Sequence, residues 1–161
     1  MKQTLAWISS INLGEEALGQ LSGQFRILLV KEGSLSIPGF HLAPHFDVEV
    51  IDCVKEGCWE ADMIVLAGEG TGAKFLDKIR EVATQKIVLL LMAENEQEKE
   101  RIISQIREAL PFSKVVTADL QSYKALLSGE NKSAVATATE VLRLVGYTVT
   151  ASGAGGGHIG I

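Results

Sequence analysis

Continuous apolar runs alternate with amphipathic segments along most of this 161-residue chain. The longest run, residues 87–93, reads Ile-Val-Leu-Leu-Leu-Met-Ala and has the length of a strand buried on both faces. A sheet with one face in water has strands that alternate polar and apolar residues, whereas a parallel sheet covered by helices on both sides does not. The pattern therefore predicts an α/β fold with a doubly wound, mainly parallel sheet in a single domain.

Periodicity and turn residues give the expected elements. Predicted strands span residues 4–8, 25–30, 47–51, 63–67, 86–92, 114–117, 123–127 and 147–151, and predicted helices span residues 13–22, 71–83, 96–110 and 133–145, with weaker structure at 33–44. Pro111 follows the third helix, Asn131 is expected to cap the fourth and Gly146 to end it. We expect the first strand to be central and buried in a sheet of roughly six to eight strands. Residues 1–152 form the predicted domain and the glycine-rich residues 153–161 a flexible tail.

Composition and charge exclude several classes of partner. Hydrophobic residues make up 47% of the chain, which is enough for a full core. The net charge is -5 and the basic residues are scattered, so no surface for nucleic acid is expected. No apolar run approaches the roughly 20 residues of a membrane span. The first residues do not show the pattern of a secretory signal, and we expect a cytoplasmic protein.

Neither the cysteines nor the histidines have the spacing of a metal site. Cys53 and Cys58 have no second pair and are expected to be reduced and structural. His41 and His45 would share a helix face, but Pro44 argues against that helix. A loop that covers the sheet edge is the alternative interpretation, and no metal is expected.

The segment after the first strand occupies the place of a dinucleotide-binding phosphate loop in a Rossmann-like domain. Its candidate cofactor-binding residues are Ser9, Ser10, Ile11, Asn12, Leu13 and Gly14. Aligned on the pattern G-x-G-x-x-G, the three glycine positions are Ser9, Ile11 and Gly14. Only the glycine that lets helix and strand pack closely is kept, and a β-branched residue stands where pyrophosphate approaches the backbone. The scaffold is therefore expected, with a weakened phosphate contact.

Two further segments follow strands and are candidate cofactor contacts. Gly68, Gly70 and Thr71 lie between a predicted strand and a predicted helix, where free backbone N–H groups can cradle phosphate. The alternative is a flexible turn made less attractive to anions by Glu69. After the second strand stand Lys31 and Glu32, and their charges favour NADP and NAD respectively. The choice between the two cofactors stays open. The alternative interpretation of Lys31 and Glu32 is a solvated strand end that contacts no cofactor.

The order of segments resembles the deazaflavin-dependent NADP reductase family, whose members share a Rossmann-type domain. Residues 61–67, Ala-Asp-Met-Ile-Val-Leu-Ala, resemble that family's strand A-D-V-V-V-L-A, and residues 110–118 resemble its segment L-P-x-x-x-V-V-K-A. Residues 126–131 and 140–149 are similar to its V-A-G-D-D strand, its helix and its closing L-G-F-x-x-V strand. The resemblance implies NADP(H) binding and hydride transfer with a deazaflavin or another small acceptor. The chain departs from the family at Thr117, where relatives carry a lysine or arginine near the nicotinamide.

Two functional hypotheses follow. The first is an NADP-dependent oxidoreductase that binds its cofactor through residues 9–14 and 68–72. No catalytic side chains can be assigned, and none is required, because the cofactors carry the hydride chemistry. The second is a non-catalytic protein that has lost dinucleotide binding. It would serve as a binding, regulatory or assembly module and would form a homodimer. The sequence leaves open whether the chain is an enzyme, and fold analogy favours the first hypothesis.

Overall fold

The structure is a computed structural model that describes residues 2–8, 15–30, 47–67, 73–93 and 95–153. In these residues the strands are β1 (Gln3–Trp7), β2 (Phe25–Val30), β3 (Val48–Ile51), β4 (Met63–Ala67), β5 (Ile87–Met92), β6 (Lys114–Gln121), β7 (Lys124–Gly129) and β8 (Thr148–Gly153). The helices are α1 (Glu15–Ser22), α2 (Val54–Glu60), α3 (Ala73–Ile79), α4 (Glu96–Ala109) and α5 (Lys132–Val145). None of these helices is long and apolar enough to cross a membrane.

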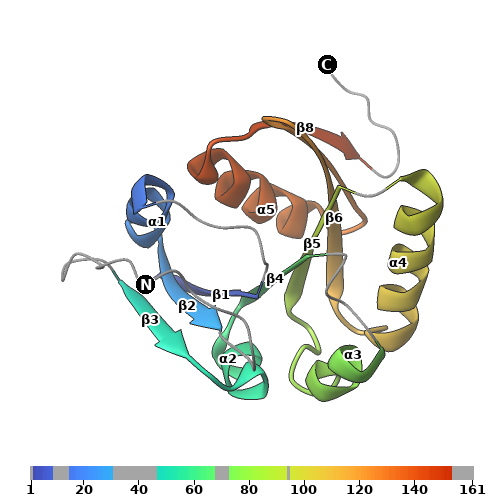
Figure 1. Ribbon diagram of the computed structural model, residues 1–161, viewed down its shortest axis with the longest axis horizontal. Coiled ribbons are helices and arrows are strands. Elements are labelled where there is room, and N and C mark those ends of the chain that lie inside the picture. Colours follow the sequence, from blue (N-terminus) through green and yellow to red (C-terminus); the bar gives the residue numbers. More distant parts are fainter. Residues whose placement is uncertain (1, 9–14, 31–46, 68–72, 94, 154–161) are drawn as a thin grey trace.

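All of these strands belong to one sheet, in the order β3-β2-β1-β4-β5-β6-β7-β8 (Figure 1). The strands from β3 to β6 run parallel, β7 is antiparallel to β6, and β8 runs parallel to β7. The first strand lies between β2 and β4, and residues 4–7 are buried. The predicted doubly wound α/β fold with a central first strand is confirmed.

Helices cover both faces of the sheet and create two separate cores. Leu5 and Trp7 of β1 belong to the core that includes residues of α1 and α5, whereas Ala6 belongs to the core that includes residues of α2, α3 and α4. Figure 1 shows these two groups of helices on opposite sides of the sheet. Each central strand thus sends alternate side chains into different cores, which explains its continuous apolar sequence.

The predicted boundaries of the long helices are confirmed. The side chain of Asn131 accepts a hydrogen bond of 2.9 Å from the backbone N–H of Ala134 at the start of α5. That helix ends at Gly146, whose φ of 118° lies in the left-handed region that favours glycine. Helix α4 is capped by Asn95 and ends before Pro111. Helix boundaries set by such local chemistry can be found from sequence.

Several element boundaries differ from the sequence expectations. Helix α3 ends at Ile79 rather than at residue 83, and turns follow it. Strand β6 continues to Gln121 because it forms a hairpin with β7 around Ser122 and Tyr123. The predicted tail begins inside β8, whose last residue is Gly153; residues 154–161 and the segment 33–44 lie outside the described residues.

Helix α2 was not predicted, and its formation depends on contacts with the sheet. Val54, Gly57 and Cys58 are its buried residues. The Lys86 ammonium group donates hydrogen bonds to the carbonyl oxygens of Cys58 and Trp59 at the end of the helix. A positive charge at that end also interacts favourably with the helix dipole. These stabilising contacts come from distant parts of the chain.

The backbone of α2 packs so closely on the sheet that Gly57 leaves no room for a side chain. A Cβ atom at this position would lie 2.7 Å from Ile51 Cδ1 and 2.9 Å from Val30 Cγ2. We expect Gly57→Ala to lower the free energy of unfolding. The cost of overpacking is about 1–3 kcal/mol and opposes the gain of up to ~1 kcal/mol in helix propensity. Urea denaturation measures the change.

The control for this substitution is Lys55→Ala, which is on an exposed position of the same helix. It should leave the free energy of unfolding within about 0.5 kcal/mol of the original protein. A Gly57→Ala variant that is more stable than the original protein would contradict the close packing of α2.

Both cysteines are free thiols, as predicted, and their environments differ. Cys53 is exposed, whereas Cys58 is buried in the core under α2. Burial raises the pKa of Cys58 from 9.0 to about 12, and the nearby Lys86 charge only partly offsets this effect. Because the thiolate is the reactive form, Cys58 is chemically protected in the folded protein.

A thiol-reactive disulfide reagent at pH 8 should therefore modify one cysteine per folded chain and both after unfolding. Cys53→Ser should abolish the fast reaction, and Cys58→Ser should leave its rate unchanged. Peptide mapping of the labelled protein identifies the modified residue. Rapid labelling of Cys58 in the folded protein would show that the core under α2 is open to solvent.

Candidate functional site

The three segments with candidate cofactor residues follow three neighbouring strands. Parallel strands β2, β1 and β4 lie side by side, and Trp7 at the end of β1 is in register with Leu29 and Val65. The segments therefore leave the sheet at the same carboxyl edge. The candidate residues themselves lie outside the described residues: Ser9, Ser10, Ile11, Asn12, Leu13, Gly14, Lys31, Glu32, Gly68, Gly70 and Thr71.

The strand order reverses between β1 and β4. From β1 the chain continues to α1 on one face, and from β4 it continues to α3 on the other. A backbone hydrogen bond of 2.9 Å from Ile8 N to Val65 O continues the pairing up to the point where the two connections diverge. Open α/β sheets bind ligands at such a switch point, outside the carboxyl ends of the strands.

Helix α1 follows the first candidate segment and is fixed to the core by Leu18 and Leu21. Its first two residues are Glu15 and Glu16, and the side chain of Glu16 is exposed. Acidic residues stabilise a helix N-terminus, but their charge opposes the approach of a pyrophosphate to the same place. Together with Ile11, this charge predicts weaker phosphate binding than in a loop with three glycines.

An ion pair between α4 and β6 lies farther along the carboxyl edge. Lys99 Nζ lies 2.7 Å from Asp119 Oδ2 and 3.5 Å from Glu96 Oε1, and Asp119 is in register with Met92 at the end of β5. The Lys99 side chain is buried, and its hydrogen bond to Asp119 raises the pKa of the lysine. Asp119 Oδ1 is buried without a hydrogen-bond partner among the described residues. Sequence reasoning missed this pair, because no local pattern links the two residues.

The structure also shows the surroundings of Thr117, which the resemblance aligns with a basic residue. Thr117 is buried in β6, and its hydroxyl group donates a hydrogen bond of 3.4 Å to the carbonyl oxygen of Ser128 on β7. This position therefore serves the packing of the hairpin. In the described part of the chain, no group of three or more His, Cys, Asp or Glu residues could hold a metal ion. His41 and His45 lie outside that part.

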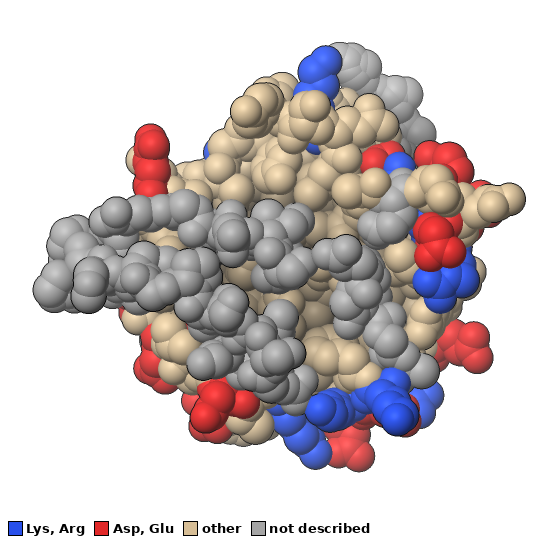
Figure 2. Space-filling model, in the orientation of Figure 1, with Lys and Arg blue, Asp and Glu red and all other residues tan. Residues whose placement is uncertain are grey.

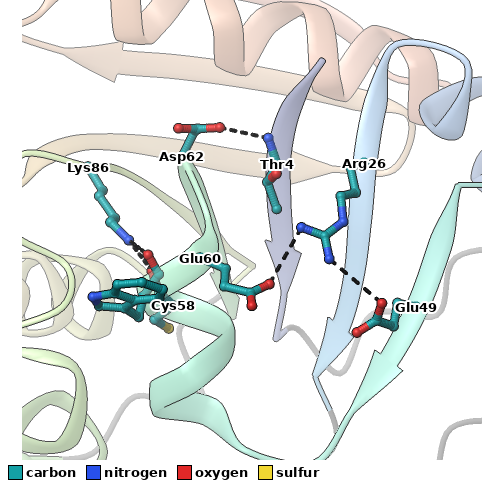
Figure 3. Close-up of polar contacts among 8 residues, drawn as sticks. Thr4, Arg26, Glu49, Cys58, Glu60, Asp62 and Lys86 are labelled. Carbon is teal, nitrogen blue, oxygen red and sulfur yellow. Dashed lines mark hydrogen bonds and ion pairs between the residues drawn. The ribbon is translucent and has the colours of Figure 1, made fainter. Parts of the chain in front are cut away.

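Polar contacts at the opposite, amino edge tie the strands and helices together (Figure 3). The backbone N–H of Thr4 donates to Asp62 Oδ2 at 2.8 Å, which joins the start of β1 to the start of β4. Arg26 lies 3.6 Å from Glu49 and 3.5 Å from Glu60, so it links β2 to β3 and α2. Each of these side chains bonds to a group of another element, which indicates a structural role.

The face in Figure 2 carries no continuous field of one charge among its described residues. Lys and Arg alternate with Asp and Glu along its lower and right-hand margins. A surface that follows the phosphates of a nucleic acid would instead present a basic stripe. The view agrees with the absence of clustered basic residues in the sequence.

Comparison with known proteins places the fold. No protein-family model and no curated protein matches the chain. A pyrroline-5-carboxylate reductase from Coxiella burnetii superposes with a TM-score of 0.71 at 17% identity, over 94% of this chain and 59% of that one. An imine reductase variant from Myxococcus stipitatus in complex with NAD+ gives 0.68 at 14%, over 95% and 55%. The fold is that of Rossmann-like NAD(P) reductases.

A Plasmodium falciparum pyrroline carboxylate reductase with NADP bound is also similar, with a TM-score of 0.62 at 12% identity over 92% of this chain and 57% of that one. The chain thus spans somewhat more than half the length of these reductases. The coarser part of the resemblance, a Rossmann-like fold that reductases also have, is confirmed. The deazaflavin-dependent family remains a hypothesis.

The pair between buried Lys99 and partly buried Asp119 can be tested by removing one or both charges. Lys99→Met leaves the Asp119 carboxylate without its partner and should lower the free energy of unfolding by about 1–3 kcal/mol. The double variant Lys99→Met/Asp119→Leu removes both charges and should recover most of that loss. Chemical denaturation of the single and double variants measures the difference.

Arg101→Ala is the matched control, because Arg101 forms an exposed pair with Glu98 on the same helix. Its expected effect is about 0–1 kcal/mol. If the double variant were no more stable than Lys99→Met, the loss in the single variant would not come from an unpaired Asp119 carboxylate.

Proposed function

We propose that the chain binds NADP(H) at the carboxyl edge of β2, β1 and β4, as the dinucleotide-binding domain of a reductase-type protein. The observation that supports this is the topology: all three candidate segments follow adjacent strands at the switch point. The similar structures include reductases in complex with NAD+ and with NADP. Lys31, which directly follows β2, favours the 2′-phosphate of NADP, although Glu32 beside it would favour NAD.

Each segment has a distinct part in the proposal. Residues 9–14 would meet the pyrophosphate at the start of α1, and Gly68, Gly70 and Thr71 would give the cofactor a close approach at the end of β4. The bound nicotinamide would supply the hydride chemistry. The protein would hold and orient the cofactor, and we assign no catalytic side chain. The expected affinity is low because of Ile11 and the acidic start of α1.

The acceptor and the setting are finer parts of the same proposal. A deazaflavin, or another small acceptor, is proposed on the resemblance of residues 61–67 and 110–118 alone. A cytoplasmic location agrees with the cofactor class. The proposed domain is the predicted 1–152 together with Gly153, the last residue of β8, and the rest of the predicted 153–161 segment forms the proposed flexible tail.

A second candidate function is a non-catalytic binding, regulatory or assembly module that keeps the fold. The observation in its favour is the combination of Ile11 in a glycine position with Glu15 and Glu16 at the start of α1. Both features act against a bound pyrophosphate. Binding measurements separate the two functions directly.

Calorimetric titration with NADPH, NADP+, NADH, NAD+ and a deazaflavin tests the proposal. The double variant Ser9→Gly/Ile11→Gly should bind NADP(H) about tenfold more tightly than the original protein, because the backbone amides become accessible to phosphate; this corresponds to ~1.4 kcal/mol. Gly70→Val should weaken both cofactors. Lys31→Ala should weaken NADP(H) and spare NAD(H).

The control is Glu49→Gln, whose side chain pairs with Arg26 at the amino edge away from the proposed site. It should change no binding constant. If neither the original protein nor the glycine variant binds any of these ligands, the cofactor proposal is wrong. The fold would then serve the second candidate function.

A further inference from the structure

The two outer strands of the sheet protect their free sides to different degrees. Strand β3 is four residues long and carries Glu49, with Asp47 and Asp52 beside it. Strand β8 is six residues long and contains neither charge nor proline. Short length, charge and proline are the usual devices that prevent edge strands from pairing with other chains. Strand β8 has none of them.

The backbone groups of β8 that face away from the sheet can be assigned from its pairing. The N–H of Thr148 donates to the carbonyl oxygen of Tyr123 at 2.8 Å, and β8 runs parallel to β7 in the register Thr148 to Lys124. In a strand, alternate residues direct both backbone groups to the same side. Thr148, Thr150 and Ser152 therefore bond to β7. Val149, Ala151 and Gly153 face the free side, where no other described strand pairs with them.

We propose that β8 pairs in antiparallel orientation with β8 of a second copy of this chain, about a twofold axis at Ala151. In this register Ala151 faces its own counterpart, and Val149 faces Gly153 of the other copy. All three pairs are of the hydrogen-bonded kind and exchange both N–H···O bonds, which gives roughly six hydrogen bonds across the axis. The two sheets would join into one.

The free side of β8 is complementary to the same strand of a second copy. Its outward-facing groups are symmetric about Ala151, so one strand complements another without a shift in register. The strand brings no like charges together. Ala151 is small and exposed, so its side chain does not obstruct the approach of a second strand. Helix α5 covers one face of β7 and β8, and Leu126 and Thr150 are exposed on the other, so the joined sheet would keep a helix-covered face and an exposed face at the seam.

The interface lies away from the proposed cofactor site, because β8 and the switch point are separated by β5, β6 and β7. Dimer formation and dinucleotide binding can therefore be measured independently. Loss of one is not expected to remove the other.

Sedimentation velocity tests the proposal on the full chain. The original protein should sediment as a dimer of about twice 17.3 kDa. Ala151→Pro removes an outward N–H while leaving every hydrogen bond from β8 to β7 in place, and it should raise the dimer dissociation constant at least ~10-fold. Ala151→Val keeps that N–H and should remain a dimer.

Hydrogen exchange on the original protein gives an independent test that needs no variant. The amides of Val149 and Ala151 should be protected at high protein concentration and exchange faster on dilution, while those of Thr148 and Thr150 stay protected. A monomeric original protein, a dimeric Ala151→Pro variant, or exchange at Val149 and Ala151 that does not depend on concentration would each overturn the proposal.

Discussion

The burial of the central strands on both faces is the constraint on which the rest of the structure depends. Neighbouring residues of β1 enter different cores, Leu5 with α1 and α5, and Ala6 with α2, α3 and α4. A shift of one residue in the strand would exchange the two cores and misplace every side chain. Helices must then cover both sides of the sheet. Helices α1 and α5 cover one face, and the successive helices α2, α3 and α4 cover the other.

The two edges of the sheet contribute differently to the protein. At the amino edge, Thr4, Arg26 and Lys86 each bind groups from another element, so polar contacts there reinforce the arrangement of strands. Exposed ion pairs contribute little free energy, about 0–1 kcal/mol each, so the packing of the cores provides most of the stability. The carboxyl edge between β1 and β4 carries the segments that vary most from the dinucleotide-binding pattern. We assign the proposed cofactor site to this edge.

A reductase-type fold and a modified phosphate loop are physically compatible. The fold is stabilised by the core that contains Leu18, Leu21 and the buried strands. The proposed phosphate loop lies outside that core set, so changes at Ser9 and Ile11 would be compatible with the scaffold. For the same reason, similarity of fold to NAD(P) reductases shows the scaffold, and cofactor binding stays a proposal that binding measurements test.

Local chemistry in the sequence determined the strands and the caps of the long helices. The apolar runs 25–30 and 63–67 coincide with β2 and β4, and Asn131 and Gly146 bound α5 as predicted. These features depend on side-chain volume, polarity and φ preference within a few residues. The sequence also placed the candidate cofactor residues after particular strands, although it could not order those strands in space.

Only the tertiary structure decided the features that join distant residues. Helix α2 forms because Gly57 fits against Val30 and Ile51 and because Lys86 binds its last carbonyl groups. The pair between Lys99 and Asp119 likewise depends on how α4 lies on β6. The position of β8 at the sheet edge follows from the hairpin of β6 and β7. Each of these depends on contacts between segments far apart in the chain, which periodicity within one segment cannot specify.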